Sequence, residues 1–392
     1  MDLADFLSRS GITRQDVIAR VDSAVHLTPG DVLFVSGSLV EGLGNEKSDL
    51  DLFLITSRTD IQFTSLHDVI VVVNDCIIDI RVVQQSAVEE ILGRFNHWAR
   101  QPRLARNAFE FTDDDRKFLH RLLIGEAFYG ASDLRKLKDC LDAKDLARHK
   151  LDWARHLAGT IQIDLAGLHS VGDQYSMLFA AQELLGHTMD GLLAGHGYTN
   201  PNQKWRVRLL ARLPIDWEQR LPGTISGMSA VEKFMMLHKS PESTSRSAIF
   251  EHTLRIAAFS RRVFPWAELN LLGSPDINLP LAAVAIYDRT EEAQPLPCLN
   301  FDVKIRFTEG HFELLRLGEK GPIFQLSPQA YALLCLFDGE HSMSAAIDYA
   351  KQLGSKERAQ EEIEDMIAMI RYAQFEAGTV IDEQALEAIL RG

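Results

Sequence analysis

The stretch Val32–Phe53, VLFVSGSLVEGLGNEKSDLDLF, decides the fold that we predict for this chain of 392 residues. It opens with an apolar run that predicts a buried strand, and Gly37–Ser38 follow that run directly. Ten residues later, Asp49 and Asp51 lead into a second apolar run. Because these two acids are two residues apart on an extended segment, we expect their side chains on the same face of a sheet.

This pair of carboxylates predicts a site for a divalent cation. Two carboxylates held side by side repel each other, and a bound cation relieves that repulsion. Oxygen ligands of this kind suit Mg²⁺, which takes one or two carboxylates and completes its shell with water and substrate phosphate. Gly37–Ser38 predict a close approach of phosphate, because glycine has no Cβ and serine offers a hydroxyl.

A third acid, Asp79, supports the same interpretation. The apolar runs 69–73 and 76–83 predict two more strands, separated by a turn at Asn74–Asp75. Asp79 lies in the second run among isoleucine and valine, where a carboxylate is costly unless it is paired or bound to a metal. If its strand lies beside that of Asp51, three carboxylates converge.

In order and spacing, this part of the chain, about residues 30–85, resembles the DNA polymerase beta-type nucleotidyltransferase superfamily. The resemblance implies two Mg²⁺ ions and an NTP, with ATP as the expected nucleotide, in an in-line displacement at the α-phosphorus. The implied catalytic residues and metal ligands are Asp49, Asp51 and Asp79. Gly37 and Ser38 would hold the NTP phosphates, and Asp79 would also help to deprotonate the attacking hydroxyl. Each element alone also fits an ordinary turn residue or strand-end cap.

The composition bounds the class of protein. Hydrophobic residues make up 46% and charged residues 24% of the chain, as in globular proteins with two or three domains at this length. No apolar run reaches a membrane span, and the N-terminus lacks the basic start of a signal peptide. The four cysteines lack metal-binding spacing, so we expect buried thiols in a cytoplasmic protein. The net charge of −14 counts against DNA or RNA as a partner.

Residues 112–285 show almost no strand pattern, which favours a helical bundle on the acceptor side of the enzyme. One basic stretch within them contains Lys204, Arg206, Arg208 and Arg212. We predict that Lys204 reaches the β- and γ-phosphates of the nucleotide, with Trp205 as a pocket wall. The alternative is that the basic side chains lie on a solvated helix face and Trp205 lies in the core.

The C-terminal part predicts three short strands within 301–326 and then three helices, with Ser327 as an N-cap before Pro328. This order, with the motifs LSPQAY and FDG, resembles the small PqqD-like fold, a peptide chaperone of winged-helix type. The resemblance implies that residues 300–380 bind the leader of a ribosomally made precursor peptide as an added strand near 323–326. DNA binding is the poorer alternative, because 301–392 contain nine Lys and Arg against sixteen Asp and Glu. The other alternative is that this part of the chain is a module for packing or dimerisation.

The fold class expected is therefore α+β. Its expected domains are a nucleotidyltransferase core with a mixed sheet (1–110), a helical bundle (111–290) and a PqqD-like winged-helix domain (298–392). The expected function is Mg²⁺-dependent transfer of NMP from an NTP to an unidentified acceptor, in a ribosomal-peptide modification pathway. Two alternatives stay open: transfer to a small antibiotic or metabolite with a structural C-terminal domain, and a non-catalytic nucleotide-binding scaffold.

Overall fold

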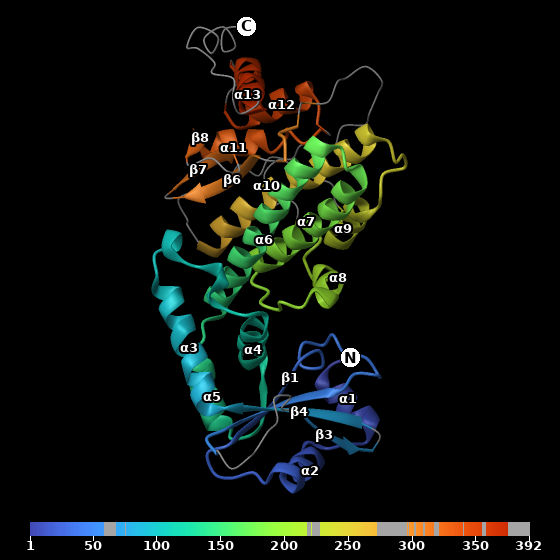
Figure 1. Ribbon diagram of the computed structural model, residues 1–392, viewed down its shortest axis with the longest axis vertical. Coiled ribbons are helices and arrows are strands. Elements are labelled where there is room, and N and C mark those ends of the chain that lie inside the picture. Colours follow the sequence, from blue (N-terminus) through green and yellow to red (C-terminus); the bar gives the residue numbers. More distant parts are fainter. Residues whose placement is uncertain are drawn as a thin grey trace. The chain divides into compact units, whose positions relative to one another are not determined.

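The structure is a computed structural model (Figure 1). It describes residues 1–58, 68–74, 76–217, 221, 228–272, 296, 298–301, 303–308, 310–316, 321–339, 341–354 and 358–374. The chain is α+β, as predicted, and forms two compact units. These are Met1–His149 with Thr199–Trp205, and Lys150–Tyr198 with Arg206–Gly392. The units divide the chain differently from the three expected domains, which stay a prediction. The expected boundary at 290–298 lies outside the described residues, apart from Leu296 and Cys298.

The first unit is built on a five-stranded mixed sheet with the strand order β3-β4-β2-β1-β5. Its strands are β1 Val32–Ser36, β2 Leu50–Thr56, β3 Asp68–Val73, β4 Cys76–Gln84 and β5 Glu126–Tyr129. β2 and β4 run parallel, and the other neighbouring strands run antiparallel. The apolar runs predicted the first four strands. They did not predict β5, which has only four residues and no buried side chain.

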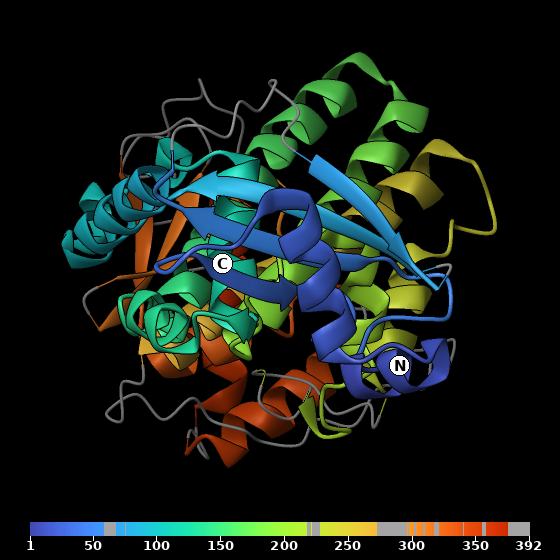
Figure 2. The same cartoon turned by 90° about the horizontal axis from the view of Figure 1, so that it is seen from below.

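Helices cover both faces of this sheet (Figure 2). One core, which includes Leu52 and Ile80, lies between the sheet and the first two helices. The other core contains Phe34 and Phe53, whose rings stack with centroids 5.2 Å apart. The helices are α1 Leu3–Ser10 and α2 Arg14–Val25 on the first face, and α3 Gln85–Arg100, α4 Asp113–Ile124 and α5 Ala131–Asp139 on the second. Since strand residues alternate between faces, Asp51 shares the second face with Phe53.

His149 is a buried histidine enclosed by aromatic rings of the first unit. Its ring makes edge contacts with Trp98 and Phe111, with centroids 4.9 and 5.0 Å away. Burial, and then the positive charge of Arg116, lower the pKa of His149 to about 3. The ring is therefore neutral in the folded chain under mildly acidic conditions that protonate a histidine of the unfolded chain.

Mild acid is expected to destabilise the first unit through His149. The unfolded chain binds a proton here below about pH 6.5 and the folded chain only near pH 3, so stability falls with pH between these values. From about pH 7 to about pH 5, the wild type should lose about 2 kcal/mol more free energy of unfolding than His149→Phe. Chemical denaturation at both pH values measures this difference.

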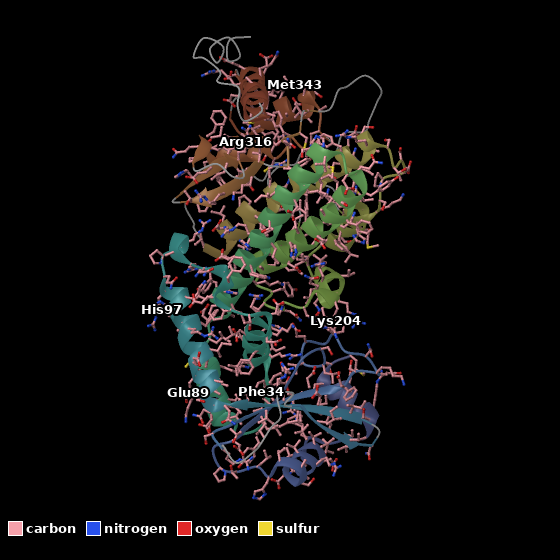
Figure 3. The ribbon with its side chains drawn as sticks, viewed as in Figure 1. Phe34, Glu89, His97, Lys204, Arg316 and Met343 are labelled. Atoms are coloured by element: carbon pink, nitrogen blue, oxygen red, sulfur yellow. The ribbon has the colours of Figure 1, made fainter. Side chains whose placement is uncertain are left out.

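The exposed His97 of α3 offers a matched control (Figure 3). His97→Gln should keep the pH dependence of the wild type, because it leaves the buried His149 and its surroundings unchanged. A His149→Phe variant with unchanged pH dependence would contradict the prediction.

The second unit combines long helices with a small sheet. Its helices are α6 Ala143–Val171, which begins in the first unit, α7 Gln174–Gly195, α8 Arg206–Leu210, α9 Ala230–His238 and α10 Arg246–Leu272. The C-terminal module follows, with β6 Val303–Thr308, β7 His311–Arg316, β8 Pro322–Leu326, α11 Pro328–Leu334, α12 Met343–Gln352 and α13 Ala359–Gln374. Short 3₁₀ turns lie at Arg103–Ala105, Ala108–Glu110 and Gln203–Trp205. The predicted order of three strands and three helices is therefore observed.

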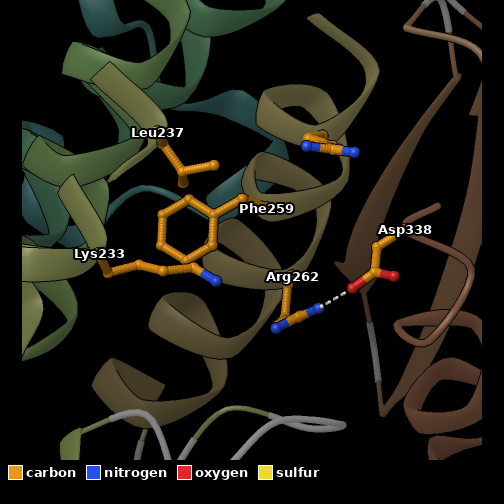
Figure 4. Close-up of a pocket in the computed structure, with 6 residues that line it drawn as sticks. Lys233, Leu237, Phe259, Arg262 and Asp338 are labelled. Carbon is orange, nitrogen blue, oxygen red and sulfur yellow. Dashed lines mark hydrogen bonds and ion pairs between the residues drawn. The ribbon is translucent and has the colours of Figure 1, made fainter. Parts of the chain in front are cut away.

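Local chemistry explains how the C-terminal module forms. Its strands make an antiparallel sheet in the order β6-β7-β8. Ser327 caps α11 by accepting a hydrogen bond from the Ala330 amide at 3.1 Å, and Pro328 occupies the first helical position, as predicted. Arg262 of α10 donates to the Asp338 carboxylate at 3.0 Å (Figure 4), which ties the module to that long helix.

The structure tests two expectations that came from the composition, one on membrane-spanning helices and one on the cysteines. None of the helices in the described part of the chain combines the length and apolar composition needed to cross a lipid bilayer. All four cysteines lie in described residues, and none forms a disulfide. Cys76 and Cys335 are buried as expected, and Cys298 is half-buried. The expectation is wrong for Cys140, which is exposed because it follows the surface helix α5.

Candidate active site

Parallel pairing of β2 with β4 places Asp51 directly opposite Asp79. Residues paired in register project from the same face of a sheet, so the two carboxylates lie side by side. This is the neighbourhood expected from the sequence. Asp49 precedes β2 by one residue and is exposed, whereas Asp51 and Asp79 are half-buried.

The turn after β1 is shaped around Asp51. Gly37 has a φ of +84°, a left-handed conformation that favours glycine. A Cβ added to Gly37 would overlap the Oδ2 atom of Asp51. The Gly37 carbonyl accepts from the Glu41 amide at 3.3 Å, and the Ser38 carbonyl accepts from the Leu43 amide at 2.7 Å. The glycine-serine turn therefore packs directly against the Asp51 carboxylate.

Charges of the first unit converge on Asp51. Its pKa is raised to about 6, chiefly by burial. The nearby charge of Arg121 acts in the opposite direction and lowers the pKa. Repulsion from Asp49 and Asp79 raises it further, and the charge of Lys204 lowers it. Two carboxylates and two cations thus lie within electrostatic range of Asp51.

Helix α4 delivers Arg121 to this site. The helix begins after Thr112, which forms a capping box with Asp115: the Asp115 amide donates to the Thr112 hydroxyl at 3.1 Å, and the Thr112 amide donates to the Asp115 carboxylate at 3.0 Å. The guanidinium carbon of Arg121 lies 5.2 Å from the centroid of the Phe53 ring. An arginine stacked in this way is a suitable donor to phosphate oxygens.

The segment Thr199–Trp205 brings a second cation. It belongs to the first unit, although the residues that flank it belong to the second. Lys204, labelled in Figure 3, is exposed, and its Nζ lies 4.8 Å from the centroid of the Trp205 ring. Its charge lowers the pKa of Asp51, so the lysine predicted to meet the nucleotide lies near the carboxylates.

The other basic residues of that stretch, Arg206, Arg208 and Arg212, belong to the second unit. Arg206 belongs to the second unit and makes a bidentate ion pair with Asp190, at 3.0 and 2.7 Å. Arg208 lies on α8 of the same unit. The stretch that looked continuous in sequence is therefore divided between the two units.

The donor set at Asp51 and Asp79 fits Mg²⁺ that arrives with a nucleotide. Among the described residues, no three His, Cys, Asp or Glu side chains form a ready-made metal cage. Mg²⁺ does not require one, because it commonly binds through one or two carboxylates and completes its shell with water and substrate phosphate. The turn at Gly37 packs against the Asp51 carboxylate, beside this donor set.

Comparison with solved structures finds a likeness in fold. The chain resembles the crystal structure of a nucleotidyltransferase-like protein from Exiguobacterium sibiricum 255-15, with 16% sequence identity and a TM-score of 0.33. The likeness covers 66% of this chain and 74% of that one. A TM-score this low does not bear on what the present chain does. No protein-family profile and no curated protein sequence matches the chain.

Four residues near the site were missed in the sequence: Glu41, His120, Arg121 and Asn200. Glu41 lies in the spacer after Gly37–Ser38, where nothing distinguishes it from a solvated acid. His120 and Arg121 stand between the apolar residues of α4, and such an interruption is a signal for function. Asn200 is 6% exposed, and a buried polar side chain of this kind is visible only in the structure.

Proposed function

We propose that the protein is a Mg²⁺-dependent nucleotidyltransferase that transfers NMP from an NTP to a hydroxyl-bearing acceptor. The observation that carries the proposal is the register of Asp51 with Asp79, beside a glycine turn that the Asp51 carboxylate fills. Asp49, Asp51 and Asp79 are the proposed metal ligands. Gly37, Ser38 and Lys204 are the proposed nucleotide-binding residues, and ATP is the first nucleotide to test.

Each residue has a definite part in this reaction. The acceptor oxygen forms a bond to the α-phosphorus while the bond from that phosphorus to the β-phosphate oxygen breaks, and pyrophosphate leaves. Asp79 receives the proton of the attacking hydroxyl. Lys204 and Arg121 bind the phosphate oxygens, where their charges stabilise the departing pyrophosphate. Mg²⁺, when bound, supplies Lewis acidity to the phosphates and lowers the pKa of the acceptor hydroxyl.

Mg²⁺-dependent release of pyrophosphate is the expected activity. The chain is incubated with each of the four NTPs and a library of hydroxyl-bearing acceptors, and pyrophosphate is measured with Mg²⁺ and after chelation by EDTA. Release with at least one NTP, lost in EDTA, is expected because the carboxylates need the cation to accommodate the triphosphate. Nucleotide binding without any release would instead indicate a non-catalytic scaffold.

The sheet face beside Asp79 favours an acceptor with an apolar part. Ile70 pairs with Asp79, and Val72 pairs with Ile77, so these side chains share one face. Ile70, Val72 and Ile77 are 67%, 53% and 51% exposed, which is unusual for aliphatic residues on neighbouring strands. An acceptor that places its hydroxyl at Asp79 would lay its apolar part on these residues. Small antibiotics, metabolites and peptides with apolar side chains all meet this condition.

A peptide acceptor has support from the C-terminal module. Among the described strands, β8 pairs with β7 alone, and four of its five residues are exposed or half-buried. A strand edge of this kind can accept a further strand from a peptide leader, as the PqqD-like resemblance implies. Co-encoded precursor peptides therefore belong in the acceptor library. Pyrophosphate release that such a peptide stimulates would support this candidate, and release that only small molecules stimulate would count against it.

A further inference from the structure

The segment that carries Lys204 is held by a small buried network. Asn200 Nδ2 donates to the Oε2 atom of Glu41 at 2.5 Å. The same Glu41 oxygen lies 3.4 Å from His120 Nε2, and the opposite ring nitrogen, Nδ1, lies 2.9 Å from the Thr199 hydroxyl. Glu41, His120, Thr199 and Asn200 therefore join three pieces of chain that are distant in sequence.

Each piece carries a proposed ligand of the nucleotide. Glu41 lies in the turn that begins at Gly37, and its amide donates to the Gly37 carbonyl. His120 directly precedes Arg121 on α4. Asn200 lies four residues before Lys204, within the segment that packs with the first unit. The network therefore ties the segment of Lys204 to the turn at Gly37 and to the helix of Arg121.

Burial makes these contacts strong. Asn200 is 6% and His120 4% exposed, and only 14% of the Glu41 side chain is exposed. A hydrogen bond from an amide to a buried carboxylate is stronger than one in water, because the surrounding medium screens it less. The Asn200 oxygen also accepts from the Asn202 amide at 2.8 Å, and the Asn202 oxygen accepts from the Lys204 amide at 3.1 Å. Because of these two bonds, fixing Asn200 in place also restrains the backbone at Lys204.

We propose that Glu41, His120 and Asn200 are positioning residues that dock the segment Thr199–Trp205 on the first unit and so hold Lys204 at the phosphate site, a role that rests on the proposed function. We call this set the latch. It touches neither acceptor nor phosphate, and it acts through Lys204. Without the latch, the lysine would remain on the chain but would occupy the site for only a fraction of the time.

The test is a double-mutant cycle between the latch and Lys204, with kcat/KM for ATP as the readout. Asn200→Ala and Glu41→Ala remove the same bond from opposite sides, and each should lower kcat/KM by about tenfold to a hundredfold. Lys204→Met should cause a loss of similar size. In the Lys204→Met background, adding Asn200→Ala should change nothing further, because the residue acts only through the lysine. A further tenfold loss in that background would overturn the proposal.

Two controls separate positioning from general damage. Glu41→Gln keeps an oxygen that can accept from Asn200, so it should stay within about fivefold of the wild type, in contrast to Glu41→Ala. Gln203→Ala changes an exposed side chain of the same segment and should leave kcat/KM unaltered. An equal loss in Glu41→Gln and Glu41→Ala would show that the bond to Asn200 is not what matters.

A second readout keeps the latch testable if the wild type releases no pyrophosphate, a result that would reject the proposed function alone. Hydrogen exchange of the backbone amides within 199–205 reports docking directly. These amides should exchange about tenfold faster in Glu41→Ala than in the wild type or Gln203→Ala. Unchanged exchange in Glu41→Ala would overturn the latch whatever the activity.

Discussion

Replacement of Asp51 by asparagine is expected to remove nucleotidyl transfer and, at the same time, to stabilise the fold. Asparagine keeps the shape of the side chain against Gly37 but supplies no negative charge to the cation. A metal ion contributes several kcal/mol to the stabilisation of a transition state, so transfer should fall by about 10³-fold or more. Pyrophosphate release under saturating Mg²⁺ measures this loss.

The gain in stability follows from the raised pKa of Asp51. In the folded chain this pKa is about 6, against 3.8 without the fold, so protonation favours the folded state. That contribution is complete below about pH 3.8 and is lost as the pH rises through about 6. At about pH 7.5 the ionised carboxylate therefore costs up to about 3 kcal/mol, and Asp51→Asn should recover about 1–3 kcal/mol of unfolding free energy. Urea denaturation without Mg²⁺ measures the gain.

Asp49→Asn and Glu89→Gln are the matched comparisons. Asp49 is a proposed metal ligand, so its replacement should remove transfer. Because Asp49 is exposed, the same replacement should change the free energy of unfolding by less than about 0.5 kcal/mol. Glu89 is an exposed acid of α3, and its replacement should change neither quantity (Figure 3). If Asp51→Asn proved less stable than the wild type at about pH 7.5, the cost of burying the Asp51 charge beside other carboxylates would be wrong.

Replacement of Arg262 by methionine is expected to destabilise the second unit by about 3–5 kcal/mol, because it leaves a buried carboxylate without its cation. Arg262 is 3% and Asp338 5% exposed, and the guanidinium donates to both the Asp338 carboxylate and the Cys335 carbonyl, at 3.0 and 3.1 Å. His341 Nδ1 also lies 3.0 Å from the Asp338 carboxylate. Urea denaturation of the full chain measures the loss.

A second variant and a surface control sharpen this prediction. Arg262→Met with Asp338→Leu removes both charges and should be more stable than Arg262→Met alone, since no buried ion is left unpaired. Lys351→Met breaks an exposed pair with Asp348 in the same module and should cost less than about 0.5 kcal/mol. Equal losses in Arg262→Met and Lys351→Met would show that burial does not strengthen the Arg262 pair.

The elements that sequence predicted best are those with a strong apolar pattern. β1, β2 and β4 are runs of aliphatic residues, and burial of such runs decides their structure whatever surrounds them. The helix cap at Ser327 could be predicted equally well, because its hydrogen bond joins residues that are close in sequence. β5 was not, since its four half-buried or exposed residues become a strand only through pairing with β1. Tertiary pairing of that kind leaves no local trace.

The residues of the candidate site were likewise predictable where they lie close together in sequence, and not where they meet only in the fold. Asp49, Asp51 and the glycine turn lie within one short stretch, and their spacing alone indicated phosphate chemistry. The register of Asp79 with Asp51 could be stated only as a condition, because strand order is a property of the whole sheet. The contact of Asn200 with Glu41 spans 159 positions and was out of reach, since no periodicity links residues so far apart.

Because residues 199–205 belong to the first unit, the two units cannot be recombined freely between related genes. The chain leaves the first unit after His149, returns for seven residues, and leaves again at Arg206. A fragment that stops at residue 149 would carry the three acids and the turn at Gly37 but no Lys204. Recombination at any single breakpoint between Asp79 and Lys204 would therefore separate the three acids from this lysine, so the two units must be exchanged between genes together.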